Sequence, residues 1–159
     1  MGALVAGAVL VLGGCGGSDA DTTTTAAAGD GSGLEFAFGE PADPAEADRS
    51  VEIVANDDFR FTPPALTVVA GETVTFRIVN AGQVAHDFTL GDQAAQDEHE
   101  AQMAEDGMIM SDAPNAVTVQ AGETEELTWR FTEAGTVLIG CHQPGHYAAG
   151  MTGEITVGP

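Results

Sequence analysis

The chain has 159 residues, 25 of them acidic and only four basic, so its formal net charge at pH 7 is −21. So acidic a surface repels nucleic acid and anionic lipid headgroups, which argues against a nucleic-acid-binding protein and against membrane binding by charge. It would instead attract a partner protein with a basic docking surface, although salt adaptation or a GC-rich genome accounts for the composition equally well.

The first fifteen residues (1–15) have the pattern of a bacterial lipoprotein signal peptide. A short apolar stretch ends in Leu12-Gly13-Gly14-Cys15, which makes Cys15 the expected lipidation site. The stretch is too short to span a bilayer as a mature helix. No Lys or Arg precedes Arg49, so the usual basic segment is missing and the true translation start stays open. We expect an exported protein, lipid-anchored at the outer face of the cytoplasmic membrane or in the periplasm, that contacts the membrane through this anchor only.

Residues 16–48 consist mainly of Gly, Ala, Thr, Ser and acids. Because few large apolar side chains are present, this segment cannot bury enough surface to offset its ordering entropy. We interpret it as a flexible acidic tether with a root-mean-square reach of about 30 Å. The remaining residues, 49–159, have the usual length of one domain.

Short apolar or alternating runs separated by turn signals fill most of residues 49–159. Such runs predict an all-β antiparallel sandwich of seven or eight strands. They lie at residues 51–55, 66–69, 73–79, 116–119, 125–131, 136–140 and 153–157.

The segment 92–106 is the exception, because it has helix formers and no Gly or Pro. We predict one short helical insertion there, ended by Gly107. His99 and Met103 are four residues apart and share a helical face. With Met108 and Met110 they form a hypothetical second copper site, for Cu(I). The alternative, which we favour, is that the methionines pack the helix onto the sandwich.

The strongest chemical signal lies near the C-terminus, where Cys141, His146 and Met151 follow one another at intervals of five residues. His86 supplies a second imidazole from far upstream. Two imidazoles, one thiolate and a weak axial thioether form the ligand set of a blue-copper electron-transfer site. The alternative is a buried structural cysteine beside two surface histidines and a core methionine, but it must explain four coincidences of residue type and order.

At these residues the chain resembles the cupredoxin family of plastocyanin/azurin-like blue copper proteins, which are Greek-key β-sandwiches. Within the family it is most similar to bacterial periplasmic cupredoxins of the copper-tolerance type. Further likeness lies in 59–63 and 70–76, and in the runs that flank the cysteine loop. The resemblance implies one type 1 copper per domain, with the ligands His86, Cys141, His146 and Met151.

Two positions depart from the family pattern. Many cupredoxins have Asn directly after the first histidine ligand, where this chain has Asp87. An aromatic residue often lies two positions before the cysteine, where this chain has Ile139. Neither change removes a ligand, but an acid beside the site is expected to alter the redox potential.

Cys141 followed by His142, His146 and Met151 also matches the C-terminal motif of multicopper oxidases. Those enzymes hold a trinuclear copper cluster with many additional histidines, and this chain has four histidines in total. We therefore expect no enzymatic activity, and we predict that His142 is a solvent-facing loop residue.

The sequence thus predicts a monomeric, membrane-tethered type 1 copper protein that shuttles one electron between redox partner proteins. The residues expected to form its docking face are Pro144, Tyr147, Ala148 and Ala149. The alternative function is an envelope copper-tolerance protein that binds or sequesters copper without a respiratory role.

Overall fold

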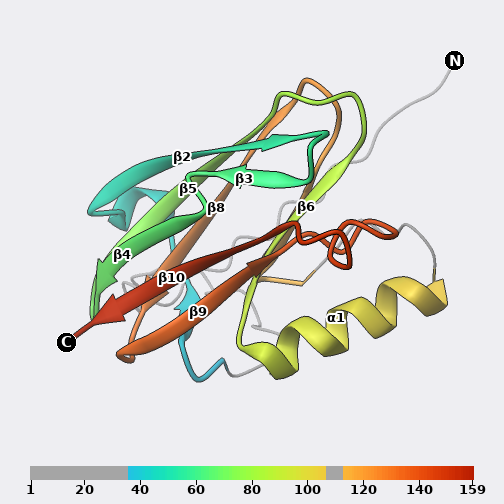
Figure 1. The fold of residues 1–159 in the computed structure, drawn as a ribbon. Helices are drawn as coiled ribbons and strands as arrows, with labels where there is room; N and C mark the ends of the chain where they lie inside the picture. The colour runs from blue at the N-terminus through green and yellow to red at the C-terminus, as the bar shows by residue number, and fades with distance from the viewer. Residues whose placement is uncertain (1–35, 107–112) are drawn as a thin grey trace, which may run out of the picture. The chain divides into compact units, whose positions relative to one another are not determined.

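Two five-stranded sheets packed face to face form the body of the computed structural model, which describes residues 36–106 and 113–159 (Figure 1). The predicted β-sandwich is confirmed, with ten strands in the described residues instead of seven or eight. No helix of this described part is long and apolar enough to cross a membrane.

The first sheet has the order β1-β8-β5-β2-β3, and within it only β2 and β5 pair in parallel. Its strands are β1 (Gly39–Pro41), β2 (Arg49–Asn56), β3 (Arg60–Thr62), β5 (Thr73–Asn80) and β8 (Thr124–Phe131).

The second sheet has the order β4-β10-β9-β6-β7, and its one parallel pair is β4 with β10. Its strands are β4 (Ala65–Val69), β6 (His86–Gly91), β7 (Ala116–Val119), β9 (Gly135–Gly140) and β10 (Thr152–Gly158). The sequence predicted only antiparallel pairs. Parallel partner strands are joined by a crossover connection and not by a short turn. Two apolar runs separated by a turn in the sequence therefore do not reveal a parallel pair.

Aromatic side chains dominate the core between the two sheets. Five of them are at most 1% exposed: Phe61, Phe76, Phe88, Trp129 and Phe131. Phe76 and Phe88 bring the two sheets into contact, with ring centroids 5.3 Å apart.

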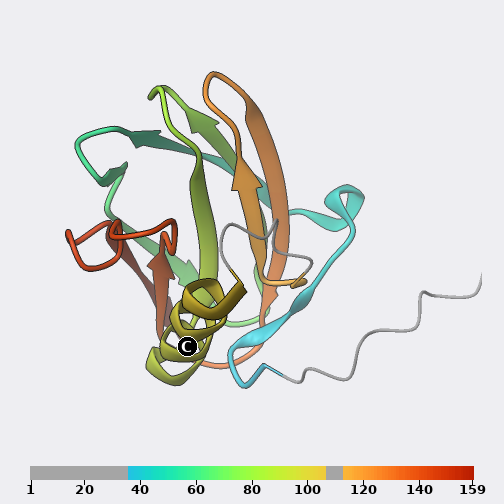
Figure 2. The same cartoon turned by 90° about the vertical axis from the view of Figure 1, so that its right-hand side faces the viewer.

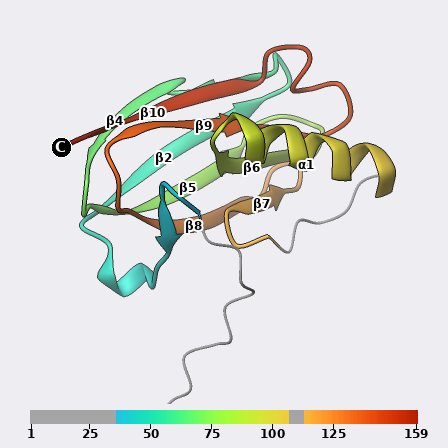
Figure 3. The ribbon, with the colours of Figure 1, turned by 90° about the horizontal axis from the view of Figure 1, so that it is seen from below.

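The predicted helical insertion is α1 (Gln93–Asp106), which connects β6 to β7. Its first-turn amide at Ala95 donates to the Asp92 side chain, so Asp92 caps the helix and the helix begins one residue later than predicted. The helix lies alongside β6 and β9 (Figure 3). Its buried residues in the described part are Gln96, His99 and Met103, spaced three and four apart and therefore on one face.

The domain begins earlier than Arg49. β1 pairs with β8, and Phe38 stacks on Trp129 at a centroid distance of 5.2 Å. Figure 2 shows this N-terminal strand, in cyan, on the side of the molecule away from the loop that follows β9. The predicted flexible tether is therefore wrong for residues 36–48, because Phe36 and Phe38 supply the apolar surface that the composition argument overlooked. The rest of the predicted tether, the signal peptide and Cys15 lie outside the described residues.

Candidate metal centre

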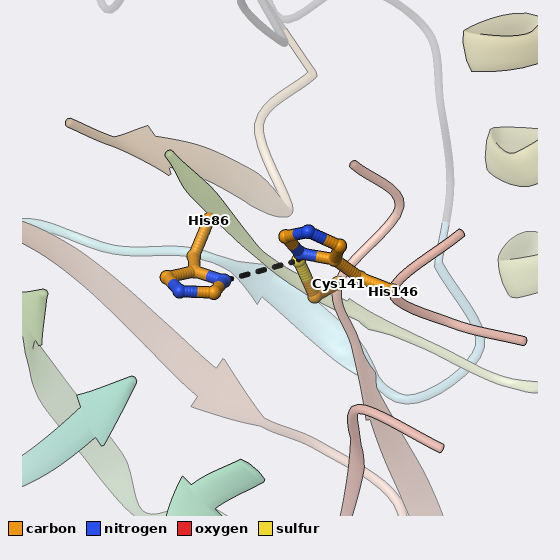
Figure 4. A group of neighbouring side chains, drawn as sticks. All are labelled: His86, Cys141 and His146. Carbon is orange, nitrogen blue, oxygen red and sulfur yellow. Dashed lines mark hydrogen bonds between the residues drawn. The ribbon is translucent and has the colours of Figure 1, made fainter. Parts of the chain in front are cut away.

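Three predicted ligands converge at one end of the second sheet (Figure 4). The Nδ1 atoms of His86 and His146 lie 3.8 Å and 3.3 Å from Cys141 Sγ. Each residue offers one ligand atom, and these atoms all lie within 4.8 Å of one another. His86 and Cys141 are fully buried, whereas His146 is half-buried.

Strand pairing explains why residues 55 positions apart meet. β6 and β9 are antiparallel neighbours in which Thr89 faces Gly140, so the start of β6, at His86, lies beside the chain as it leaves β9 at Cys141. We call residues 141–151 the ligand loop. It is closed by backbone hydrogen bonds, since Cys141 N–H donates to the Met151 carbonyl and Met151 N–H donates to the His146 carbonyl. Met151 is fully buried where this loop returns to the sandwich.

Burial sets the protonation of the three converging groups. Burial raises the pKa of the Cys141 thiol to about 12. Burial is also the main reason that the pKa values of His86 and His146 are lowered, and for His86 the neighbouring His146 adds to the effect. The histidines are therefore neutral and free to bind a metal, whereas the thiol needs a bound cation to lose its proton. Neutral imidazoles beside a soft sulfur suit copper.

Hydrogen bonds hold the sulfur and the loops around it. The backbone N–H of Asp87 donates to Cys141 Sγ at 3.3 Å. The Asp87 carboxylate Oδ1 accepts from Thr118 Oγ1 at 2.9 Å and from Gln143 Nε2 at 2.8 Å. Asp87 thus ties β6 to β7 and to the ligand loop. The sequence marked Asp87 as unusual, but it gave no sign of Gln143.

Two residues of the loop between β2 and β3 also reach the centre. The Phe59 ring packs on His146 at a centroid distance of 4.5 Å. Asp57 Oδ1 lies 3.7 Å from His86 Nε2, which is too long for a hydrogen bond but close enough for electrostatic attraction. Phe59 has a positive φ of 58°, an uncommon conformation for a bulky residue. Phe59 lies in the segment 59–63 that resembles the family, but no sequence signal marked it or Asp57 as part of the site.

His142 does not face solvent, and that prediction is wrong. The side chain is only 1% exposed, because α1 covers it. Its Nδ1 lies 2.7 Å from Glu100 Oε2, and its Nε2 lies 2.7 Å from Gln96 Oε1. Tyr147 stacks on the same ring at a centroid distance of 4.7 Å. Tyr147 is therefore half-buried, whereas Pro144, Ala148 and Ala149 of the predicted docking face are exposed.

The residues of the hypothetical second copper site are only partly described. His99 and Met103 are both buried on the inner face of α1. His99 Nε2 has no hydrogen-bond partner, and burial is the main reason that the pKa of His99 is lowered. Met108 and Met110 lie outside the described residues, so the second site stays a prediction.

Known proteins match most of the chain. The family described as "Copper binding proteins, plastocyanin/azurin family" matches residues 47–158. The copper-resistant cuproprotein CopI of Pseudomonas aeruginosa is 40% identical over 152 residues, which cover 77% of this chain and 83% of that protein. CopI of Rubrivivax gelatinosus is 41% identical over 120 residues, covering 76% and 73%. A solved structure of auracyanin B superposes with a TM-score of 0.65 at 27% identity, covering 77% of this chain and 96% of that one.

Proposed function

Because this chain belongs to the plastocyanin/azurin family of copper-binding proteins, we propose that it holds one copper ion in a type 1 site that accepts and donates a single electron. One observation carries the proposal: a fully buried cysteine sulfur meets two neutral imidazoles and accepts a backbone hydrogen bond. That donor set stabilises a thiolate only in the presence of a cation.

Each of the four proposed ligands has a distinct part. Copper, when bound, supplies one-electron chemistry between Cu(II) and Cu(I). Cys141 gives the strong sulfur bond, and His86 fixes a second position from β6. His146 is half-buried, whereas His86 and Cys141 are fully buried. His146 therefore offers the route for an electron between the buried site and a partner protein. Met151, which is fully buried, would supply a fourth and weaker donor through its thioether and would tune the reduction potential.

The test is a titration with Cu(II) of the chain that carries Cys15→Ser, a change that prevents lipidation. We expect an intense thiolate-to-copper absorption band that saturates at one equivalent, and its complete loss in a further Cys141→Ser variant. Weak absorbance, or no saturation near one equivalent, would contradict the type 1 site.

We place this copper protein outside the cytoplasm, attached by lipid at Cys15. The support is the apolar stretch ending in Leu12-Gly13-Gly14-Cys15, followed by a polar segment. In cells fed an alkyne fatty acid, we expect the chain to be labelled and to sediment with membranes. Cys15→Ala should abolish both. Labelling that persists in Cys15→Ala would exclude this anchor.

A role in copper resistance is the second candidate, and the two CopI relatives favour it, because they are named copper-resistant cuproproteins. Both roles use the same four ligands, so a cellular test must separate them. A strain lacking the chain should grow normally until copper is added if the role is resistance. A respiratory defect without added copper would instead support an electron carrier.

For an electron carrier, the partner is a redox protein with a basic docking surface, and the protein acts as a monomer. The support is the large excess of acids over basic residues, together with the exposed Pro144, Ala148 and Ala149 near His146. Electron exchange with a basic redox protein should slow as ionic strength rises. A rate that is independent of salt would remove the electrostatic part of this proposal.

A further inference from the structure

Helix α1 contacts the ligand loop at the buried side chain of His142. We propose that Gln96 and Glu100 of α1 hold His142 by both ring nitrogens and so position Cys141 and His146 for copper. The inference rests on the proposed copper function and assigns His142, Gln96 and Glu100 as positioning residues, which do not touch the metal.

The orientation of Gln96 fixes one of these hydrogen bonds. Its Nε2 donates to the Thr89 carbonyl at 3.0 Å and to the Leu138 carbonyl at 3.2 Å. The side-chain oxygen of Gln96 is therefore turned to His142, whose Nε2–H donates to it. Thr89 lies on β6 and Leu138 on β9, the two strands that carry or precede copper ligands. The fully buried side-chain amide of Gln96 therefore contacts both strands and also the His142 ring.

Glu100 completes the contact from the next turn of the helix. Gln96 and Glu100 are four residues apart and so lie on the same face of α1. The Glu100 carboxylate oxygen lies 2.7 Å from His142 Nδ1. Both partners of the ring are acceptors, so the two hydrogen bonds form together only when Nδ1 and Nε2 each carry a hydrogen, and the ring then pairs with Glu100 as a cation. The Glu100 side chain is 42% exposed, so this residue can be changed without disturbing the core.

The position of His142 transmits this restraint to two ligands. His142 directly follows Cys141, and Tyr147 directly follows His146. The two rings stack nearly parallel, with an interplanar angle of 23°. His99 adds an edge-on contact to His142 at a centroid distance of 4.9 Å. A ring held at both nitrogens and on its face therefore restrains both ends of the segment that carries Cys141 and His146.

The buried face of α1 agrees with a positioning role. Among the described side chains of α1, the buried Gln96 makes three hydrogen bonds, to the Thr89 and Leu138 carbonyls and to His142, so directional hydrogen bonds supply part of the contact of α1 with the sheet. Such bonds specify geometry more strictly than apolar contact does. The residue before Cys141 is Gly140, and a Cβ there would lie 2.8 Å from His142 Nε2. It would also meet the side-chain oxygen of Gln96 on α1, so the close approach of the helix favours a glycine at this position.

Four variants test the proposal, each made in the whole chain that carries Cys15→Ser. His142→Phe keeps the stack on Tyr147 and removes both hydrogen bonds. Glu100→Ala removes one of them, and Glu100→Gln retains an acceptor. Glu98→Ala is the matched control, because it removes an equal charge from an exposed residue of the same helix that contacts Gln102 instead of His142.

Three measurements are made: the Cu(II) absorption and EPR spectra, the rate of copper loss to a chelator, and hydrogen exchange of α1 amides without copper. We expect His142→Phe to change the spectra, to release copper about tenfold faster and to lose protection in α1, since it removes two strong hydrogen bonds. Glu100→Ala should release copper about threefold faster. Glu100→Gln and Glu98→Ala should stay close to the parent chain.

The outcomes separate this inference from the proposed function. If the parent chain shows no intense thiolate-to-copper band, the type 1 site fails, whereas hydrogen exchange in the copper-free chain still decides whether His142 holds α1. If the parent band is intense but His142→Phe matches it in spectrum and release rate, the positioning role is overturned. Equal effects of Glu100→Ala and Glu98→Ala would also overturn it. If His142→Phe does not fold, the comparison among the Glu100 and Glu98 variants decides.

Discussion

Replacing Gly140 with alanine tests the packing between β9 and α1 with a single methyl group. The backbone of Gly140 lies outside the left-handed region, so alanine adds no backbone strain. Its Cβ would nevertheless lie 2.8 Å from His142 Nε2 and 3.0 Å from a Tyr147 ring carbon, and closer still to the Gln96 side-chain oxygen. A clash of this kind typically costs about 1–3 kcal/mol, and displacing Gln96 would weaken a hydrogen bond worth about 1 kcal/mol.

The entropy that alanine removes from the unfolded chain offsets about 0.4–1 kcal/mol of this cost. We therefore expect Gly140→Ala to lower the free energy of unfolding by about 1–3 kcal/mol. Urea unfolding of the copper-free chain, followed by the fluorescence of the single, fully buried Trp129, measures this loss.

Gly158→Ala is the matched control, because its Cβ would meet nothing closer than the Val68 carbonyl at 3.6 Å. It should leave stability unchanged or slightly raised. Adding Gln96→Ala to Gly140→Ala should cost less than the sum of the two single changes, because the clash is then relieved. If Gly140→Ala is as stable as Gly158→Ala, the close contact between Gly140 and α1 does not exist.

Further predictions concern the copper centre itself. Met151→Leu should keep copper but raise the reduction potential in voltammetry, because Cu(II) loses a donor, and an unchanged potential would remove Met151 from the ligands. Asp57→Asn should raise the potential by tens of millivolts, roughly, since it removes a negative charge 3.7 Å from His86 Nε2, and a lower potential would contradict this. Burial lowers the pKa of His86 and of His146, so in the copper-free chain the unfolded state takes up protons first as the pH falls. Urea unfolding should therefore show stability decreasing from pH 7.5 to 5.5, by up to about 1.4 kcal/mol per histidine and pH unit, and a flat profile would refute this. At the alkaline side the pKa of Cys141 is about 12 and the unfolded thiol ionises first, so stability should fall again above pH 9, except in Cys141→Ser.

The fold and the three converging ligands could be predicted because local signals encode them. Alternating apolar runs marked most strands, and the spacing of Cys141, His146 and Met151 marked one loop whose residue types suit a single metal. The matching family confirms the predicted cupredoxin relationship and the copper cofactor. The start of the helix could be predicted only to within one residue, because the capping residue Asp92 and a first helical residue look alike in sequence.

The error at residues 36–48 had a different origin. Composition described that segment as low in apolar surface, yet Phe36 and Phe38 pack on Trp129 and β1 pairs with β8. Averaging over a window hides two aromatic residues that pack against the core. The sequence pattern can indicate a tether, but it does not show where the tether ends.

The environment of His142 could not be predicted because it depends on how α1 docks. Cys141 and His142 follow the end of β9, and Cys141 turns to the metal centre whereas His142 turns to α1. A loop residue is ordinarily solvated, and no sequence signal shows that Gln96 and Glu100, more than 40 positions earlier, cover this one. Long-range docking by polar contacts has no periodic signature, in contrast to an apolar stripe.

The burial of β6 bears on the electrostatics of the copper centre. Every residue of β6 is buried. In an antiparallel sandwich a strand usually exposes alternate side chains to water, so full burial is unusual for β6, which lies next to the edge strand β7. The core covers the face that carries Phe88 and Leu90, and α1 lies beside the strand on the other face, near Thr89. Cys141 follows β9, the strand beside β6, and is itself fully buried, so burial raises the pKa of its thiol to about 12 and the thiol resists ionisation without a metal. A cation that enters this site meets neutral histidines and a sulfur held in place by backbone donors. Copper uptake at pH 7.5 should therefore release about one proton.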